Sequence, residues 1–315
     1  MLNDLYFAFQ VTAPIFCILG LGIYFKRIGL LTADFARVGS ELVFKVTLPF
    51  LLFVKLVQTD FTHSLPVTLV GYAFCATVAV FLLLDRVVAR MITEPSDRGV
   101  FVQGAFRGNM GIIGLAYCLS AFGEGAVATA SVYMAVITAL YNVLAVITLS
   151  RHQGEGAGKN ALAAVARGIV TNPLIIAIAL GVAISLSGLQ IPQILLNTGG
   201  YFAKMTLPLA LLCAGATIRL QEFQSSRALY WASAAKLLLV PLAITGGGIL
   251  LGLRGPEMGV LFFMSSAPTA AASYPMVQAF RLNHHLAAAI IAATSLGAIV
   301  SSTLGVFLLR VLDLI

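Results

Sequence analysis

Long runs of apolar residues, each separated from the next by a few polar positions, account for most of the chain. About 20 consecutive apolar residues can span the hydrocarbon core of a bilayer as a helix, so these runs predict ten transmembrane helices. They cover residues 4–25, 34–57, 66–90, 98–120, 125–149, 171–188, 192–218, 227–253, 257–280 and 285–311. The pattern therefore predicts an all-α polytopic membrane protein.

The fourth and the ninth of these runs contain residues that interrupt a helix. Residues 107–114 read Arg-Gly-Asn-Met-Gly-Ile-Ile-Gly, and each glycine lowers helix propensity by about 1 kcal/mol relative to alanine. Residues 265–275 hold Pro268 and Pro275 among small hydroxyl residues, and proline removes a backbone donor. Irregular backbone at membrane depth is tolerated only where protein buries it or where it lines a cavity. Both helices are predicted to be broken at a transport site.

An internal repeat relates residues 1–150 to residues 171–315. At one common offset, residues 11–14 match 170–173, residues 29–30 match 188–189, and residues 45–49 match 204–208. Clusters aligned at one offset indicate duplication. Each half holds five predicted helices, so the second half is expected to be inverted in the membrane, as in secondary transporters. Residues 151–170 form the linker between the halves, and residues 160–167 are a candidate interfacial helix.

Positive charges gather in the loops on one predicted side of the membrane. They are Lys26, Arg27, Arg37, Arg86, Arg90, Arg98, Arg151, Lys159, Arg167, Arg219, Arg227 and Arg281, whereas the other side has only Arg254 and Arg310. Cytoplasmic loops carry the excess of Lys and Arg. We therefore expect a protein of the cell (inner) membrane with both termini outside the cytoplasm.

Composition supports this class and disfavours others. The chain is 60% hydrophobic and 10% charged, with a mean hydropathy of +0.99, whereas soluble domains carry about 25% charged residues. The net charge of +7 comes without the aromatic-interleaved basic patch that a nucleic-acid partner needs. The four cysteines lack zinc spacing, and there is no metalloprotease, P-loop or dinucleotide motif. We expect no cofactor, no metal and no enzymatic activity.

Ionisable side chains within the predicted spans are the candidate functional groups. The cations Arg107, Lys45, Lys204 and Lys236 outnumber the one comparable acid, Glu41, and each such charge costs about 2.5–3.5 kcal/mol at the bilayer centre. Lys45 can pair with Glu41 or contact substrate. Lys204 and Lys236 can each meet a partner residue or a substrate carboxylate, and Arg107 can face a vestibule instead.

The excess of cations favours an anionic substrate and argues against a cation antiporter. The N-termini of half-helices carry partial positive charge and free N–H groups that bind anions. Asn109 and Thr269 would add neutral donors there. The polar pair Tyr141-Asn142 in the fifth span can line the cavity or bond to a neighbouring helix.

Motifs along the whole chain resemble the auxin efflux carrier family. The residues that carry the resemblance are Pro14 to Gly22, Thr47-Leu48-Pro49, Arg107 to Leu115, Ser265 to Thr269 and Ala279 to Asn283. The short central linker is similar to that of the bacterial branch, which includes putative malate and malonate permeases. It differs from the linker of the plant auxin exporters, which makes auxin, an aromatic carboxylate, a disfavoured substrate.

The resemblance implies a fold like that of bile-acid symporters and the antiporter NhaA, with crossed broken helices 4 and 9. Helices 1, 2, 6 and 7 would form a scaffold, often dimeric, and helices 3–5 and 8–10 a transport domain that moves as an elevator. The expected substrate-binding residues are Gly108, Asn109, Met110, Gly111, Ser266, Pro268, Thr269, Tyr141, Asn142, Lys45 and Lys204. Glu41, Arg107 and Lys236 are expected to serve coupling or ion pairing.

The function expected from these features is secondary active transport of small organic anions, such as malate or malonate. The expected partners are the substrate, the lipid bilayer, H⁺ or Na⁺ as a coupling ion, and a second copy of the chain. An anion-selective channel and a sodium-coupled symporter of the bile-acid type are the alternatives.

Overall fold

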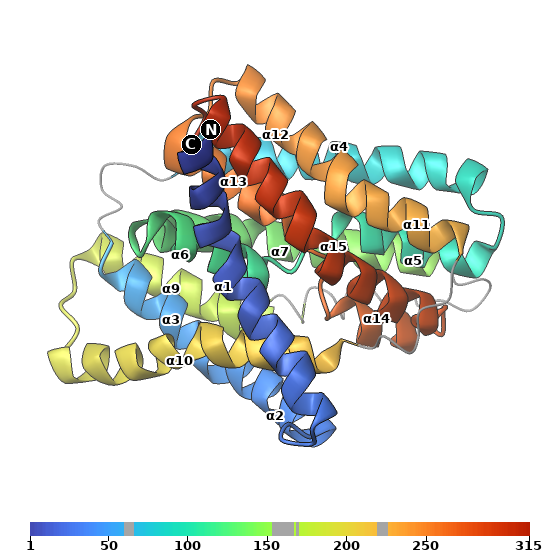
Figure 1. Cartoon of the computed structure of the whole chain (residues 1–315). Coiled ribbons are helices and arrows are strands. Elements are labelled where there is room, and N and C mark those ends of the chain that lie inside the picture. The colour runs from blue at the N-terminus through green and yellow to red at the C-terminus, as the bar shows by residue number, and fades with distance from the viewer. Residues whose placement is uncertain (60–65, 153–166, 168–169, 219–225) are drawn as a thin grey trace.

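The computed structural model describes residues 1–59, 66–152, 167, 170–218 and 226–315, and all of its regular elements there are helical (Figure 1). The long uninterrupted helices are α1 (Leu2–Arg27), α4 (Val67–Met91), α7 (Gly125–Arg151), α9 (Pro173–Ser187), α10 (Gln193–Thr217) and α15 (His284–Val311). Their bounds agree with the predicted spans to within a few residues. The candidate interfacial helix over residues 160–167 lies, apart from Arg167, outside the described residues.

Two predicted spans are continuous helices that widen into a π-helical turn in the middle. The second span consists of α2 (Ala33–Leu42), η1 (Val43–Thr47) and α3 (Leu48–Val57), and the eighth of α11 (Arg227–Ala234), η4 (Ala235–Leu239) and α12 (Val240–Leu250). A proline follows each π turn, Pro49 and Pro241. Proline cannot donate the bond that a regular helix needs there, and a π turn accommodates the missing bond. The π turns contain Lys45 and Lys236.

The fourth and ninth spans are interrupted, as the sequence predicted. In the fourth, α5 (Pro95–Phe106) is followed by residues 107–109 in non-helical conformation, then by η2 (Met110–Gly114) and α6 (Leu115–Phe122). In the ninth, α13 (Gly255–Ser266) is separated from α14 (Ser273–Ala279) by residues 267–272.

Helix length and hydropathy identify a polytopic membrane protein. The candidate spans are Leu2–Arg27, Val67–Met91, Gly125–Arg151, Arg227–Leu250 and His284–Val311, and the shorter apolar helices are Met110–Phe122 and Pro173–Ser187. Many large apolar side chains on the outer helix surfaces are exposed, for example Leu195, Leu242 and Val300. Side chains of this kind are suited to contact with lipid.

The helices pack in two groups that meet along the middle of the molecule. One group contains α1, α2, α3, α9 and α10, and the other contains α4, α5, α7, α11, α12 and α13. Helix α15 packs against α1 of the first group and α11 of the second. The two termini lie close together (Figure 1), and Arg310 Nε is 3.9 Å from a carboxylate oxygen of Asp4.

The contact between α1 and α10 depends on two glycines. A side chain at Gly22 would overlap the carbonyl oxygen of Leu212, and one at Gly215 would overlap the carbonyl oxygen of Leu19. Small residues let membrane helices approach closely, and close packing stabilises helix pairs in lipid. This pair of helices is therefore in backbone contact.

We expect Gly215→Ala to lower the thermal unfolding midpoint of the purified protein, because the added methyl group forces α1 and α10 apart. Overpacking of this kind costs about 1–3 kcal/mol. Gly200→Ala, in the same helix with open space around it, is the matched control and should leave the midpoint unchanged or raised. Equal midpoints for the two variants would contradict the close-contact account.

Candidate functional site

The two interruptions lie side by side and pair through their backbones. The N–H of Asn109 donates to the carbonyl of Pro268 at 2.7 Å, and the N–H of Ala270 donates to the carbonyl of Arg107 at 3.0 Å. Gly108 and Thr269 thereby face each other in an antiparallel bridge. Each segment satisfies backbone groups that the other exposes, which removes the main cost of irregular backbone at this depth.

Thr269 adds two hydrogen bonds that hold the pairing in place. Its hydroxyl donates to the carbonyl of Gly104 at 2.7 Å, near the end of α5, and its N–H donates to the hydroxyl of Thr294 at 3.1 Å. The carbonyls in the last turn of a helix have no partner within the helix. Thr269 is 2% exposed, so its hydroxyl serves the structure here.

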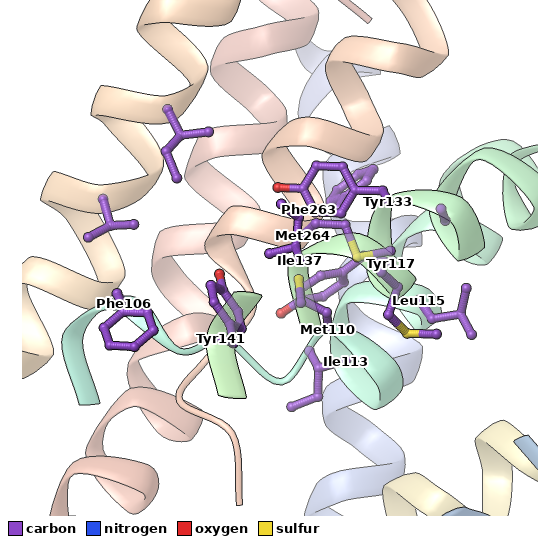
Figure 2. Close-up of a cluster of buried hydrophobic side chains, with 14 of the residues drawn as sticks. Phe106, Met110, Ile113, Leu115, Tyr117, Tyr133, Ile137, Tyr141, Phe263 and Met264 are labelled. Atoms are coloured by element: carbon purple, nitrogen blue, oxygen red, sulfur yellow. The ribbon is translucent and has the colours of Figure 1, made fainter. Parts of the chain in front are cut away.

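A cluster of buried hydrophobic side chains, several of them aromatic, includes residues on both sides of the first interruption, Phe106 and Met110 (Figure 2). The rings of Phe106 and Tyr141 meet edge to face, with centroids 5.4 Å apart, at the end of α5. Beyond η2, Tyr117 and Phe263 pack with centroids 5.6 Å apart. These side chains are almost fully buried, so they fix the interrupted segments between helices of regular geometry.

A cavity of about 840 Å³ lies next to the interruptions, a volume in the range of small-molecule sites. Of the residues expected at the site, it is lined by Glu41, Arg107, Gly108, Asn109, Met110, Gly111 and Tyr141. Residues of α2, α9 and α10 form one wall, and residues of η2, α7, α14 and α15 form the other. The cavity therefore lies between helices of the first group on one side and, on the other, α7 of the second group together with η2, α14 and α15.

Arg107 brings a buried positive charge to this cavity. Its side chain is 7% exposed, and one guanidinium nitrogen, Nη2, donates to the side-chain oxygen of Asn142 at 2.9 Å. The other, Nη1, has no hydrogen-bond partner. No carboxylate in the described part of the chain forms an ion pair with Arg107. An unpaired guanidinium favours a bidentate anionic ligand.

Asn109 offers a neutral donor beside that charge. It precedes η2 and lines the cavity, and within the described residues its side-chain amide has no hydrogen-bond partner. The first N–H groups of a helix and its dipole favour an anion. Arg107 and Asn109 together make the floor of the cavity suitable for a carboxylate.

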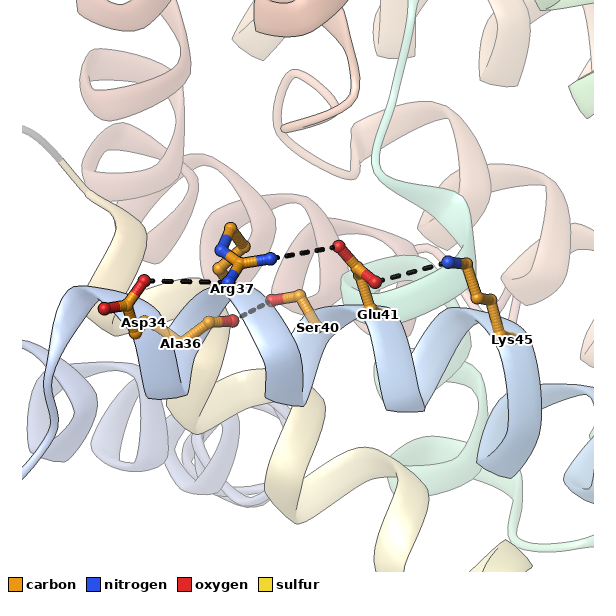
Figure 3. Close-up of polar contacts among 6 residues, drawn as sticks. All are labelled: Asp34, Ala36, Arg37, Ser40, Glu41 and Lys45. Carbon is orange, nitrogen blue, oxygen red and sulfur yellow. Dashed lines mark hydrogen bonds and ion pairs between the residues drawn. The ribbon is translucent and has the colours of Figure 1, made fainter.

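Glu41 and Lys45 belong to a row of alternating charges on α2 and η1 (Figure 3). Arg37 lies 3.6 Å from Asp34 and 3.5 Å from Glu41, and Glu41 lies 3.2 Å from Lys45. Asp34, Arg37 and Glu41 line the cavity, whereas Lys45 does not. The Glu41–Lys45 pair is one of the two alternatives expected for Lys45. The spacing of three and four residues also indicated that Asp34 and Arg37 extend the row, but Arg37 was interpreted only as a topology signal.

Lys204, Lys236, Ser266, Pro268 and Thr269 also lie outside the cavity lining. Lys204 is exposed on α10, and its charge adds to the larger effect of Lys55 in lowering the pKa of Glu124. Lys236 is fully buried behind the interruptions, and its ammonium donates to the carbonyl of Ser265 at 3.0 Å. The structure thus places Arg107 and Asn109 in the cavity lining, whereas Lys45, Lys204 and Lys236 lie outside it.

These features define a class of protein: a multi-pass membrane transport protein, with a cavity beside two helices that are interrupted within the apolar layer. The family model described as membrane transport protein matches residues 7–306. The chain therefore belongs to this family, the auxin efflux carriers, which confirms the resemblance seen in the sequence.

Two relatives match along most of their length. A protein of Escherichia coli named uncharacterized transporter YfdV is 24% identical over 313 residues, which cover 95% of this chain and 97% of the relative. A protein of Methanocaldococcus jannaschii named uncharacterized transporter MJ1031 is 23% identical over 286 residues, 87% of this chain and 90% of the relative. Family and relatives are transporters, which fits the expectation that the chain is not an enzyme.

Gly108 permits the close approach on which the site depends, and we expect Gly108→Ala to destabilise the protein. The new methyl carbon would lie 3.0 Å from Lys236 Nζ and 3.1 Å from the carbonyl oxygen of Ala267, which costs about 1–3 kcal/mol. The measurement is the thermal unfolding midpoint in detergent. Gly111→Ala, whose methyl would meet its neighbours at 3.5 Å or more, is the control. A midpoint for Gly108→Ala as high as that of the control would contradict this role.

Proposed function

We propose that the protein is a secondary active carrier of small organic anions, with dicarboxylates such as malate or malonate as the substrate class. The observation that supports this most directly is that Arg107 belongs to the cavity lining and has a buried guanidinium without a carboxylate partner in the described structure. A substrate carboxylate would supply the missing partner, and the Asn109 amide would donate to it. The substrate would then neutralise a charge that is costly to bury alone.

The proposed architecture has ten spans arranged as two inverted halves. The repeat in the sequence supports it, and so do the interruptions at corresponding places in the fourth and ninth spans. Helices 1, 2, 6 and 7 would be the scaffold, which could pair with a second copy, and the remaining helices the transport domain. The packing groups described above support this division, and an elevator movement would carry the floor of the cavity along the scaffold.

The proposed state of this structure is open to the cytoplasm. The cavity extends from Arg107 to Lys26 and Arg37, which belong to the loops rich in positive charge. With this orientation both termini lie outside the cytoplasm. On the outer side, Lys55 at the end of α3 forms an ion pair with Glu124 before α7, which would join the scaffold to the transport domain and close the outer route.

We expect Arg107→Met and Asn109→Ala to weaken dicarboxylate transport in proteoliposomes. Each variant removes a hydrogen bond to the carboxylate, worth about 1.5–3 kcal/mol where the partner is charged, so the KM should rise about 10-fold or more for Arg107→Met and less for Asn109→Ala. Arg90→Met, an exposed cation of α4 outside the cavity, is the control for loss of charge.

Imposed pH and sodium gradients in the same vesicles would identify the coupling ion. Accumulation of the anion against its gradient distinguishes a carrier from an anion-selective channel, which only dissipates a gradient. Unchanged kinetics in both variants would refute the proposed site, and transport of cations or sugars alone would refute the proposed function.

We expect Glu124→Gln to let the outer side open more often. The hydrogen bond and charge of Lys55 hold the pKa of Glu124 below its ordinary value. The pair is therefore intact at neutral pH and is lost only when acidification protonates the carboxyl group. In a cysteine-free background, a membrane-impermeant maleimide added outside should label Met110→Cys faster when Glu124→Gln is present.

Glu257→Gln makes the same chemical change at an exposed glutamate at the start of α13, on the same predicted side and without an ion-pair partner among the described residues. It should leave the labelling rate unchanged. Equal rates in the two variants would show that the Lys55–Glu124 pair does not hold the outer side closed.

A further inference from the structure

Lys236 is the one cation of the described structure that is buried completely, with 0% of its surface exposed. It lies in η4, in a span apart from the two interrupted helices, and its side chain reaches the place where they pair. Its ammonium donates to the carbonyl of Ser265 at 3.0 Å. The Lys236 nitrogen is also close to Gly108: a methyl group built on that glycine would lie 3.0 Å from Nζ. No acidic side chain of the described residues pairs with it.

Backbone carbonyls therefore provide the negative side of this contact. Ser265 lies in the last turn of α13, and Ala267 begins the interruption. The same ideal methyl position on Gly108 is 3.1 Å from the carbonyl of Ala267 and 3.4 Å from that of Met264, so two further carbonyl oxygens lie near the one that accepts from the ammonium. The C-terminal end of a helix carries partial negative charge. Unwound carbonyls and half-helix ends are the groups that hold the coupling cation in transporters with broken helices.

We propose that the ammonium of Lys236, which is covalently attached to the chain, permanently occupies the position in which such a carrier would otherwise bind Na⁺. The inference rests on the proposed function, because it assigns Lys236 to the transport site formed by the two interruptions. The ammonium neutralises the carbonyl ends from outside the cavity lining, to which Arg107 belongs. Lys236 is thus a positioning residue, which holds the geometry of Gly108 and Asn109 without touching the substrate.

Two consequences follow from a tethered cation. Transport by the parent protein does not require sodium, because the site for the ion is already filled. Removal of the side chain, in contrast, leaves a region lined by carbonyls into which a small free cation can bind, and the variant acquires a dependence that the parent lacks.

The test compares two variants that remove the charge but differ in the space they leave. Lys236→Ala opens the region, whereas Lys236→Met fills it with an uncharged side chain of similar length. Dicarboxylate uptake is measured in proteoliposomes with N-methylglucamine as the only bulk cation, and then with added Na⁺, Li⁺ or methylammonium.

The parent should transport equally in all media. Lys236→Ala should lose at least about 10-fold in rate in N-methylglucamine and should recover most of it with one of the small cations. Lys236→Met should be slow in every medium. Three results would each overturn the proposal. The parent could require Na⁺, Lys236→Ala could be as fast as the parent without small cations, or a folded Lys236→Ala could fail to recover with any of these cations.

A second measurement separates this inference from the proposed function. The thermal unfolding midpoint of purified Lys236→Ala should rise with the concentration of Na⁺ or methylammonium, because a ligand that binds only the folded state stabilises it. The midpoints of the parent and of Lys236→Met should not change with either cation. If the parent transports no organic anion, the proposed function fails, but the midpoint shift still decides the role of Lys236. A Lys236→Ala midpoint that does not change with either cation would overturn the proposed role of Lys236.

Discussion

The backbone pairing between residues 107–109 and 267–270 is the constraint on which the rest of the structure depends. In the apolar layer every N–H and carbonyl must find a partner within the protein, so a helix can be interrupted there only if something replaces its internal bonds. Here the backbone of each interrupted segment supplies hydrogen bonds to the other in place of the lost helical ones. Thr269 and Lys236 then satisfy the helix ends beside it. The halves of the chain, far apart in sequence, are thereby held together where the cavity lies.

Much of the fold could be predicted because its signals are local. Apolar runs fixed the helix bounds, and the glycines after Arg107 and the proline at 268 marked the two interruptions correctly. The π turns before Pro49 and Pro241 were missed, since a proline within an apolar run is equally compatible with a simple kink. The close contact of Gly22 and Gly215 was also beyond prediction, because glycine content does not show which helix approaches which.

The site was predictable in part. Arg107 and Asn109 stood out as polar residues within a broken span, and the structure gathers both at the cavity. The lysines could not be placed, since periodicity does not tell in which direction a long side chain extends or what it meets. Lys45 turns to Glu41 on its own helix, Lys204 lies near Glu124, and Lys236 reaches a carbonyl of another span. The Lys45–Glu41 pair is local and was one of the two alternatives open from the sequence, whereas the partners of Lys204 and Lys236 depend on tertiary contacts that no local pattern records.

The charged residues of the cavity lining other than Arg107 have a consequence for the kinetics of access. They are Lys26, Asp34, Arg37 and Glu41, two positive and two negative, and Arg37 is neutralised within its row. The charges in the lining therefore balance one another, and long-range attraction of an anion comes from the basic residues of the surrounding loops. Within the cavity, discrimination by charge is thus left to Arg107, whereas the attraction of the loops for an approaching anion weakens as salt is added. The residues that affect how fast an anion enters the cavity are thus different from those proposed to bind it.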